Sequence, residues 1–157
     1  MAIKKIVLNG DEILTKKAEK VEEINEEIKE LVKDMLDTMY ENDGIGLAAC
    51  QIGVLKSIIV YDVEYIKEEE KRKPIVFINP KITSTSKTKI EVEEGCLSFP
   101  NVFGNVVRFE KIKVEYTNLE GKRKIATGKD IEAVVMQHEL DHLDGVVFLD
   151  RSEKIEK

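Results

Sequence analysis

The chain is poor in several residue types, and each shortage excludes a class of protein. Its 157 residues include two cysteines, two histidines and no tryptophan. Two cysteines form at most one disulfide, which excludes a disulfide-stabilised secreted scaffold and leaves a buried thiol, a metal ligand or a nucleophile as the role of each. Residues 1–14 lack the apolar segment of a signal peptide, and no apolar run approaches the roughly 18 residues of a membrane helix. We therefore expect a cytoplasmic protein without a membrane partner.

An excess of basic residues is also missing. The 31 acidic residues outnumber the 25 basic ones, the net charge is -6 and the isoelectric point is near 5.2. Both signs are interspersed along the chain, so we expect no basic face for a phosphate backbone and no direct nucleic-acid partner. With 42% hydrophobic residues and no internal repeat or linker, the sequence predicts one compact domain over residues 1–157.

Two segments have the residue spacing of helices. In residues 24–40, apolar side chains recur every three or four positions with charged residues between them, which predicts an amphipathic N-terminal helix that packs on the core. Asn25 is expected to cap its start, and Gly44 to lie just past its end. A second helix is predicted from an N-cap at Asp130 to a stop at Gly145.

Between these helices the sequence predicts strands rich in β-branched and aromatic residues. They are SIIVYDV (57–63), IVFINP (75–80, closing at Pro80), KIEVEEGCLSFP (89–100) and KIKVEYTNLEGKRKIAT (111–127), the last bent into a hairpin at Glu120 and Gly121. The charged residues 64–74, EYIKEEEKRKP, are expected to form a solvated loop. Strands in the middle with a helix near each end indicate an α+β fold rather than alternating βαβ units.

Both histidines lie in the second predicted helix, four residues apart. His138 and His142 therefore project from one helix face, at a separation that can grip one metal ion. Ile131, Val134 and Val135 precede them on the same side, so we expect this face to point toward the core.

Glu139 adds a carboxylate next to this pair, where it can reach an ion-bound water. A purely structural histidine pair is the alternative, but this spacing with a following glutamate rarely arises by chance in a chain with two histidines. A metal site is therefore favoured.

The pair needs a third ligand, because catalytic zinc-type centres generally take three protein ligands and leave a position for water. Only 15 residues follow His142 and no third histidine exists, so the ligand must be an upstream Cys, Asp or Glu. Cys96 is the best candidate, because a thiolate binds borderline or soft ions strongly and Gly95 lets the backbone approach. Cys50, between small residues typical of tight packing, remains the alternative.

Three stretches taken together, GIGLAACQ (44–51), EGCLS (94–98) and QHELDH (137–142), resemble the signature motifs of the peptide deformylases in order and spacing. The resemblance implies a small α+β domain in which antiparallel strands surround a C-terminal metal-binding HExxH helix. It also implies an activity, removal of the N-formyl group from the initiator methionine of new bacterial polypeptides with release of formate.

The resemblance assigns roles to residues of this chain. Cys96, His138 and His142 would hold one divalent ion, usually ferrous iron, with zinc, nickel or cobalt able to occupy the site. Glu139 would take a proton from water and return it to the leaving amine. The side-chain amide of Gln51 and the backbone N–H of Leu97 would stabilise the developing oxyanion.

It further implies a substrate site for N-formyl-methionyl peptides and nascent chains. The methionine slot would be formed by apolar side chains, namely Ile45, Val92, Ile131, Val134 and Val135. Gly44 and Gly46 would shape a turn and pair with an extended substrate through their backbone groups, with Gly95 also at the substrate. Glu94 and Arg108 match positions that support the site, as an ion pair.

The chain departs from the family at two places. Phe103 stands where many bacterial members carry an arginine that contacts the peptide backbone, so this contact is not carried over. The sequence ends at Lys157 without the long C-terminal helix of several members, so ribosome docking through such a helix is not implied, although action near the ribosome is compatible with the resemblance.

Two other functions compete with a deformylase. A general metallopeptidase is disfavoured, because a cysteine ligand and a neutral oxyanion donor would replace the downstream glutamate and protonated histidine that such enzymes often use. A catalytically silent metal-binding or formyl-peptide-binding protein would be more credible if Glu139 or Gln51 were missing, and both are present.

Overall fold

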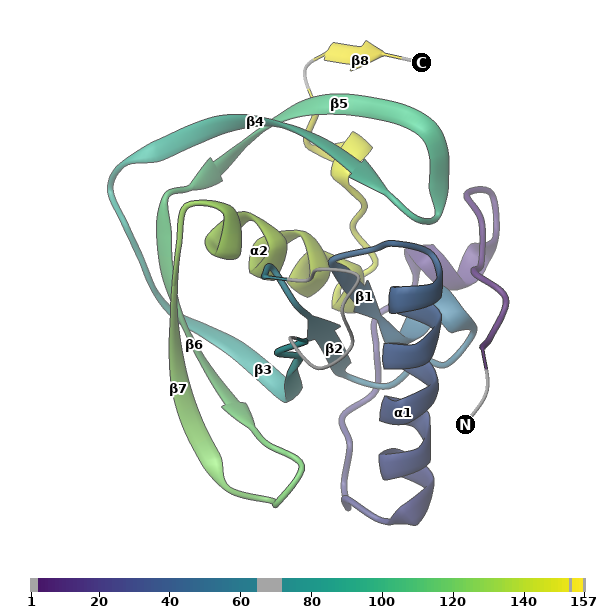
Figure 1. Cartoon of the computed structure of the whole chain (residues 1–157). Helices are drawn as coiled ribbons and strands as arrows, with labels where there is room; N and C mark the ends of the chain where they lie inside the picture. Colours follow the sequence, from purple (N-terminus) through teal and green to yellow (C-terminus); the bar gives the residue numbers. More distant parts are fainter. Residues whose placement is uncertain (1–2, 65–71, 153, 157) are drawn as a thin grey trace.

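The computed structural model of the chain describes residues 3–64, 72–152 and 154–156 (Figure 1). In this part of the chain, two antiparallel sheets enclose the C-terminal helix, as expected for the α+β class. One sheet has the strand order β1-β2-β3-β6-β7 and the other β4-β5-β8. The strands are β1 Gly46–Ala48, β2 Ile58–Tyr61, β3 Ile75–Thr85, β4 Lys89–Cys96, β5 Phe99–Phe109, β6 Lys111–Thr117, β7 Arg123–Lys129 and β8 Lys154–Glu156. The predicted loop 64–74 lies mostly outside the described residues.

The N-terminal helix α1, Glu26–Glu41, has the start that the sequence predicts. The side chain of Asn25 caps it, accepting a hydrogen bond of 3.0 Å from the N–H of Ile28. Past the other end, the N–H of Gly44 donates to the carbonyl of Met39 at 2.9 Å. The chain thus turns directly from α1 into the short strand β1, which lies beside the pocket described below.

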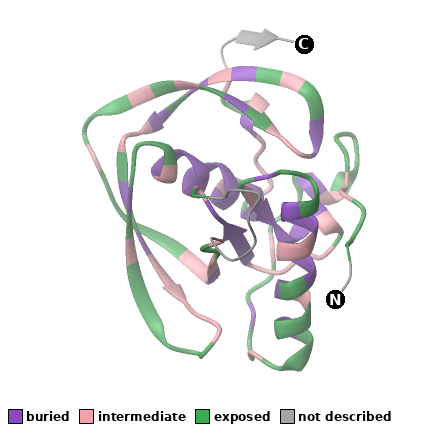
Figure 2. Cartoon of the chain, viewed as in Figure 1, coloured by how far each residue is buried: buried purple, intermediate pink, exposed green. Residues whose placement is uncertain are grey.

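Helix α2, Ile131–Leu143, is buried on nearly every side, unlike α1, whose outer face is exposed (Figure 2). It contacts β1, β2 and β7 of one sheet and β5 of the other. Asp130 occupies the N-cap position of α2, as predicted, but its side chain makes no capping hydrogen bond. The residue has a φ of 55° rather than the extended backbone of an ordinary N-cap, and its N–H donates to the carbonyl of Glu110 at 2.8 Å.

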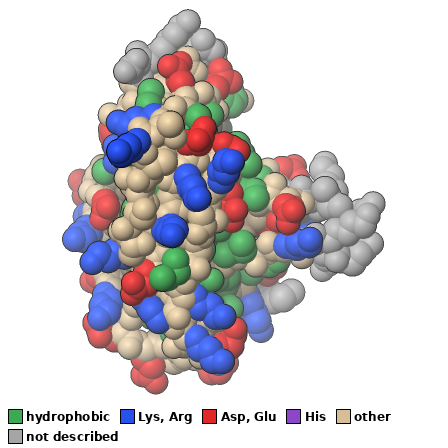
Figure 3. All heavy atoms as spheres, turned by 90° about the vertical axis from the view of Figure 1, so that its left-hand side faces the viewer, with side chains coloured by type: hydrophobic (Ala, Val, Ile, Leu, Met, Phe, Trp, Pro, Cys, Tyr) green, Lys and Arg blue, Asp and Glu red, His purple; other side chains and the backbone are tan. Residues whose placement is uncertain are grey.

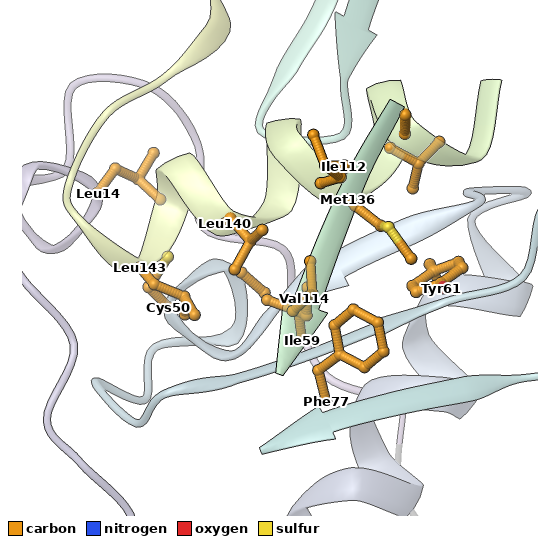
Figure 4. Packing of buried hydrophobic residues seen from close by; sticks show 13 residues of the cluster. Leu14, Cys50, Ile59, Tyr61, Phe77, Ile112, Val114, Met136, Leu140 and Leu143 are labelled. Atoms are coloured by element: carbon orange, nitrogen blue, oxygen red, sulfur yellow. The ribbon is translucent and has the colours of Figure 1, made fainter. Parts of the chain in front are cut away.

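Strand β2 separates two hydrophobic clusters. Ile58 and Val60 face α1, whereas Ile59 and Tyr61 belong to the cluster that includes α2, in which Met136 also lies (Figure 4). All four strand residues are fully buried, which explains their continuous apolar run: both faces of this strand are covered.

Two strand predictions need correction. β3 does not close at Pro80 but continues to Thr85, because a register shift between Ile78 and Lys81 accommodates the proline, which cannot donate a ladder hydrogen bond. β5 pairs with β4 over residues 99–109, whereas the sequence pattern predicts a strand only to Pro100.

The hairpin of β6 and β7 is confirmed and covers one side of the molecule. Lys111 and Lys113 are exposed while Ile112 and Val114 between them are buried, the period of a half-buried strand. Figure 3 shows charged side chains of both signs across this side. Within the described residues, no helix has the length and apolarity that crossing a membrane requires.

Candidate metal centre and active site

Three side chains from two elements meet between the sheets. Cys96 ends β4, and His138 and His142 lie one turn apart on α2, so their ligand atoms all fall within 4.8 Å of one another. The Sγ atom of Cys96 lies 3.4 Å from Nε2 of His142. This is the ligand set that the sequence favours, and Cys50 is not part of it.

Cys50 instead has the surroundings of a packed thiol. It is buried in the hydrophobic cluster under α2, where its sulfur lies 3.8 Å from the carbonyl of His142. Burial raises the pKa of the Cys50 thiol to about 12, so the thiolate form that binds metal is disfavoured there.

His138 is oriented by a carboxylate. Its Nδ1 lies 2.8 Å from Oε1 of Glu94, so Nδ1 donates its proton to that carboxylate and Nε2 is left facing the other two candidate ligands. Arg108 holds Glu94 in turn with two hydrogen bonds, of 2.7 Å from Nε and 2.8 Å from Nη2. Burial raises the pKa of Glu94, but the hydrogen bonds from Arg108 and His138 outweigh it and lower the pKa below its ordinary value.

The predicted ion pair of Glu94 and Arg108 is therefore confirmed, and it belongs to a longer network that the sequence did not indicate. Nη1 of Arg108 also donates to Oδ2 of Asp141 at 2.6 Å. Arg151, beyond the helix, binds both oxygens of Asp141 at 2.6 and 2.9 Å. A continuous network of hydrogen bonds between charged side chains thus connects Arg151, in the segment after α2, to the candidate ligand His138.

His142 is buried deeper than His138. Its side chain is fully enclosed, and burial lowers the pKa of its imidazole to about 3, with the nearby His138 and Arg108 acting in the same direction. The ring is therefore neutral at physiological pH, which is the form that can coordinate a metal.

Glu139 is a buried carboxylate with an unusual pKa. Burial raises this pKa to about 7, and among the described residues no hydrogen-bond partner reaches its Oε1. It is held against β1, because a Cβ atom built on Gly46 would lie 2.6 Å from its Oε2 and 3.0 Å from Cγ1 of Val135. Glycine at position 46 is thus required by the close approach of strand and helix.

The Gln51 amide has a fixed orientation. Its Oε1 accepts a hydrogen bond of 3.0 Å from the N–H of Ala48, so its Nε2 points toward the candidate metal centre. There Nε2 lies 3.1 Å from Oγ of Ser98 and 3.4 Å from Sγ of Cys96. The side chain therefore presents a donor, not an acceptor, to this side.

These groups border a pocket of about 690 Å³. Thirteen of the predicted site residues line it: Gly44, Ile45, Gly46, Gln51, Glu94, Gly95, Cys96, Leu97, Ile131, Val134, Val135, His138 and Glu139. His142 lies behind the lining. Val92 was predicted to line the methionine slot, but it does not line the pocket. It lies on β4 two residues before Glu94 and opposite Val106, so it is farther along the strand from the pocket than Glu94 is.

Other lining residues were not foreseen. They are Asn42, Asp43, Glu93, Phe99, Pro100, Asn101, Val102 and Phe103, mostly from the first half of β5. The missed signal was a strand continuing past Pro100, since Val102 and Val106 fall on one face and Asn101 and Asn105 on the other at strand spacing. Ile131 lines the pocket but is 56% exposed, so it lies at the mouth rather than in a buried slot.

Comparisons with known proteins identify the family of the chain. The model of the polypeptide deformylase family matches residues 3–157. The peptide deformylase of Endomicrobium trichonymphae is 50% identical over 162 residues, which covers 100% of this chain and 94% of that relative. The peptide deformylase of Rhizobium meliloti is 44% identical over 157 residues and is covered to 89%, together with 100% of this chain.

Solved structures give the same result. The crystal structure of peptide deformylase from Thermotoga maritima is similar with a TM-score of 0.91 and 37% identity, covering 98% of this chain and 100% of that chain. The enzyme from Synechococcus elongatus, solved in complex with actinonin, is similar with a TM-score of 0.90 and 42% identity, covering 95% and 80%. Neither the general metallopeptidase nor the silent binding protein is favoured by these relatives. The chain belongs to the peptide deformylase family, the metalloenzymes that remove N-formyl groups from nascent peptides.

Proposed function

We propose that this chain performs the deformylase reaction with Cys96, His138 and His142 as metal ligands and with Glu139, Gln51 and Leu97 as catalytic groups. The observation that carries the proposal is their convergence: all of them except the enclosed His142 line one pocket, and the ligand atoms of the metal set lie within 4.8 Å of one another. The products would be formate and a peptide with a free methionine amino group.

The donor set fits one divalent ion. It offers a thiol sulfur and two imidazole nitrogens, with His142 neutral and His138 oriented by Glu94. Three protein ligands leave a coordination position for water, as catalytic sites need. We propose ferrous iron as the native ion, with zinc, nickel or cobalt as substitutes, since nitrogen and sulfur ligands suit this group of metals. When bound, such an ion lowers the pKa of water and polarises a carbonyl oxygen.

Glu139 is suited to move the proton. With a pKa near 7, its carboxylate can accept a proton from the attacking water and then return it to the amine that leaves the formyl group. Two features support this role: no described residue forms a hydrogen bond with Oε1, and Oε2 lies close to Gly46.

Gln51 and Leu97 would stabilise the oxyanion that develops on the formyl oxygen. The Nε2 donor of Gln51 is held toward Cys96, and Leu97 follows Cys96 directly in the chain and lines the same pocket. Removing a single donor of this kind costs about 3 kcal/mol of transition-state stabilisation in well-studied hydrolases.

The substrate would lie extended between two sheet edges. β1 and β4 are each the end strand of their sheet, and residues of both, among them Gly46 and Gly95, line the pocket. Free backbone groups on such edges pair with an extended peptide. The methionine side chain would then enter the apolar slot bounded by Val134 and Val135 of α2 and by Ile45. We place this reaction in the cytoplasm, on nascent chains near the ribosome and without direct nucleic-acid contact.

One experiment tests the proposal. Protein loaded anaerobically with ferrous iron is expected to release formate from formyl-Met-Ala-Ser, whereas Glu139→Ala is expected to retain the metal and lose the activity. Metal analysis and a formate assay measure both. Metal-replete wild-type protein that binds the peptide without cleaving it would contradict the catalytic proposal and leave a binding role.

A further inference from the structure

Three large apolar side chains that are exposed to solvent converge on the mouth of the pocket. Ile45, before β1, is 41% exposed, Phe103 on β5 is 44% exposed, and Ile131 at the start of α2 is 56% exposed. Single exposed apolar residues are ordinary on protein surfaces, but several from different elements that gather at one pocket mark a surface that contacts a ligand. Ile45 and Ile131 belong to the slot proposed for methionine, so Phe103 is the member of this group that extends the contact surface beyond that slot.

Phe103 is the distinctive member of this group. The other four phenylalanines of the chain are buried or half-buried, so only this one presents a large part of its ring to solvent. It lies opposite Gly95 in the pairing of β4 and β5, and a Cβ atom built on Gly95 would lie 3.0 Å from Cε1 of its ring. One part of the ring therefore covers Gly95, the residue before the ligand Cys96, while the rest remains available in the pocket.

The geometry of an extended peptide assigns a partner to this ring. Successive side chains of an extended chain point to opposite sides. If the methionine side chain points toward Val134 and Val135 of α2, the next side chain points away from α2. On β4, Glu94 faces α2, so Gly95 after it and Phe103 opposite Gly95 on β5 lie on the face of this hairpin that is turned away from α2. The second residue of the substrate is thus directed toward the ring.

We propose that Phe103 is a specificity-determining residue that packs against the side chain following formyl-methionine, so that the enzyme favours substrates with an aromatic or large aliphatic second residue. The inference rests on the proposed deformylase function and specifies its substrates. Aromatic rings gain from stacking or edge contacts beyond the area they bury, which corresponds to roughly a threefold to tenfold effect on a rate constant.

The test compares formyl-Met-Xaa-Ser peptides with Phe, Leu or Ala as Xaa. Wild-type enzyme is expected to show a kcat/KM about threefold to tenfold higher for Phe than for Ala, carried mainly by KM. Phe103→Ala is expected to bring this ratio close to one. Phe103→Leu keeps an apolar contact, so its kcat/KM is expected to be higher for the Leu peptide than for the Ala peptide. Val107→Ala is the matched control, because Val107 lies on the same strand with the same 44% exposure but outside the pocket lining, and its ratio is expected to equal that of wild type.

Several outcomes would overturn the proposal. A wild-type ratio near one, or an unchanged ratio in Phe103→Ala with normal metal content, would remove it. A loss confined to a parallel formyl-Met-Ala-Xaa series would show that the ring contacts the third residue instead. Cleavage of every peptide without dependence on Phe103 defeats only this inference, whereas cleavage of none defeats the proposed function itself.

Discussion

Oε1 of Glu94 lies 2.8 Å from Nδ1 of His138, so one of the two candidate histidine ligands is held by a buried carboxylate that Arg108 holds in turn. Partners of this kind determine which ring nitrogen faces a metal and how basic it is. The strength of metal binding should therefore depend on residues that never touch the ion.

Glu94→Gln tests this dependence. The amide removes the charge that accepts the Nδ1 proton and leaves Arg108 without a bidentate partner, so we expect metal affinity or kcat/KM to fall about tenfold to a hundredfold. Competition with a chelator measures the affinity. Retention of wild-type affinity by a folded Glu94→Gln protein would show that His138 needs no carboxylate.

Arg151→Ala tests the outer end of the network. Arg151 is half exposed and binds Asp141, so we expect unfolding to become easier by no more than about 1 kcal/mol but metal release to become measurably faster. Arg123→Ala is the control, because Arg123 forms a similar exposed pair with Glu115 on the far hairpin. Equal metal release from both variants would contradict a link between Arg151 and the metal centre.

Gly46→Ala should damage catalysis rather than metal binding. The added Cβ would lie 2.6 Å from Oε2 of Glu139 and would displace this carboxylate, and a small displacement of a catalytic group can cost about a hundredfold in rate. We expect kcat to fall by about tenfold to a hundredfold at unchanged metal content. Rates equal to those of wild type would mean that Glu139 tolerates the shift and is not the proton carrier.

The raised pKa of Glu139 predicts how the stability of the metal-free protein varies with pH. The folded protein holds a proton on Glu139 up to about pH 7, whereas the unfolded chain releases it near 4.5, so stability falls as pH rises between these values. Glu139→Gln abolishes this loss, and at pH 8 the variant should be more stable than wild type by an amount on the order of 3 kcal/mol. Denaturant titrations at pH 4.5 and 8 measure the difference. A difference that does not change with pH would refute the raised pKa.

Air oxidation distinguishes the two cysteines and the proposed metals. Ferrous enzyme is expected to lose activity in air while the nickel form persists, with oxygen adducts on Cys96, which borders the pocket. Cys50 should stay unmodified, because burial disfavours its thiolate. Formate release over time measures the loss of activity, and peptide mass spectrometry detects the oxygen adducts on each cysteine. Modification of Cys50 before Cys96 would argue against this assignment.

Local spacing alone was enough to predict the parts of the molecule that depend on neighbours in the chain. His138 and His142 are four positions apart, which places both rings on one helix face, and Asn25 caps α1 through a contact three residues away. The hairpin of β6 and β7 depends likewise on the short turn between them. The three motifs, compared with a known family, supported Cys96, which its residue type and neighbours already favoured, and added the reaction.

Only the tertiary structure decided the rest, because these features join segments far apart in the chain. The sequence favoured Cys96 over Cys50 as the third ligand, but only the fold brings its ligand atom within 4.8 Å of those of His138 and His142. Asp141 lies 33 residues from Arg108, and no local pattern relates them. Phe103 reaches the pocket because β5 pairs with β4, a pairing whose register is set by long-range packing. Sequence thus determined the chemistry available to this protein, and the fold determined which of its side chains meet.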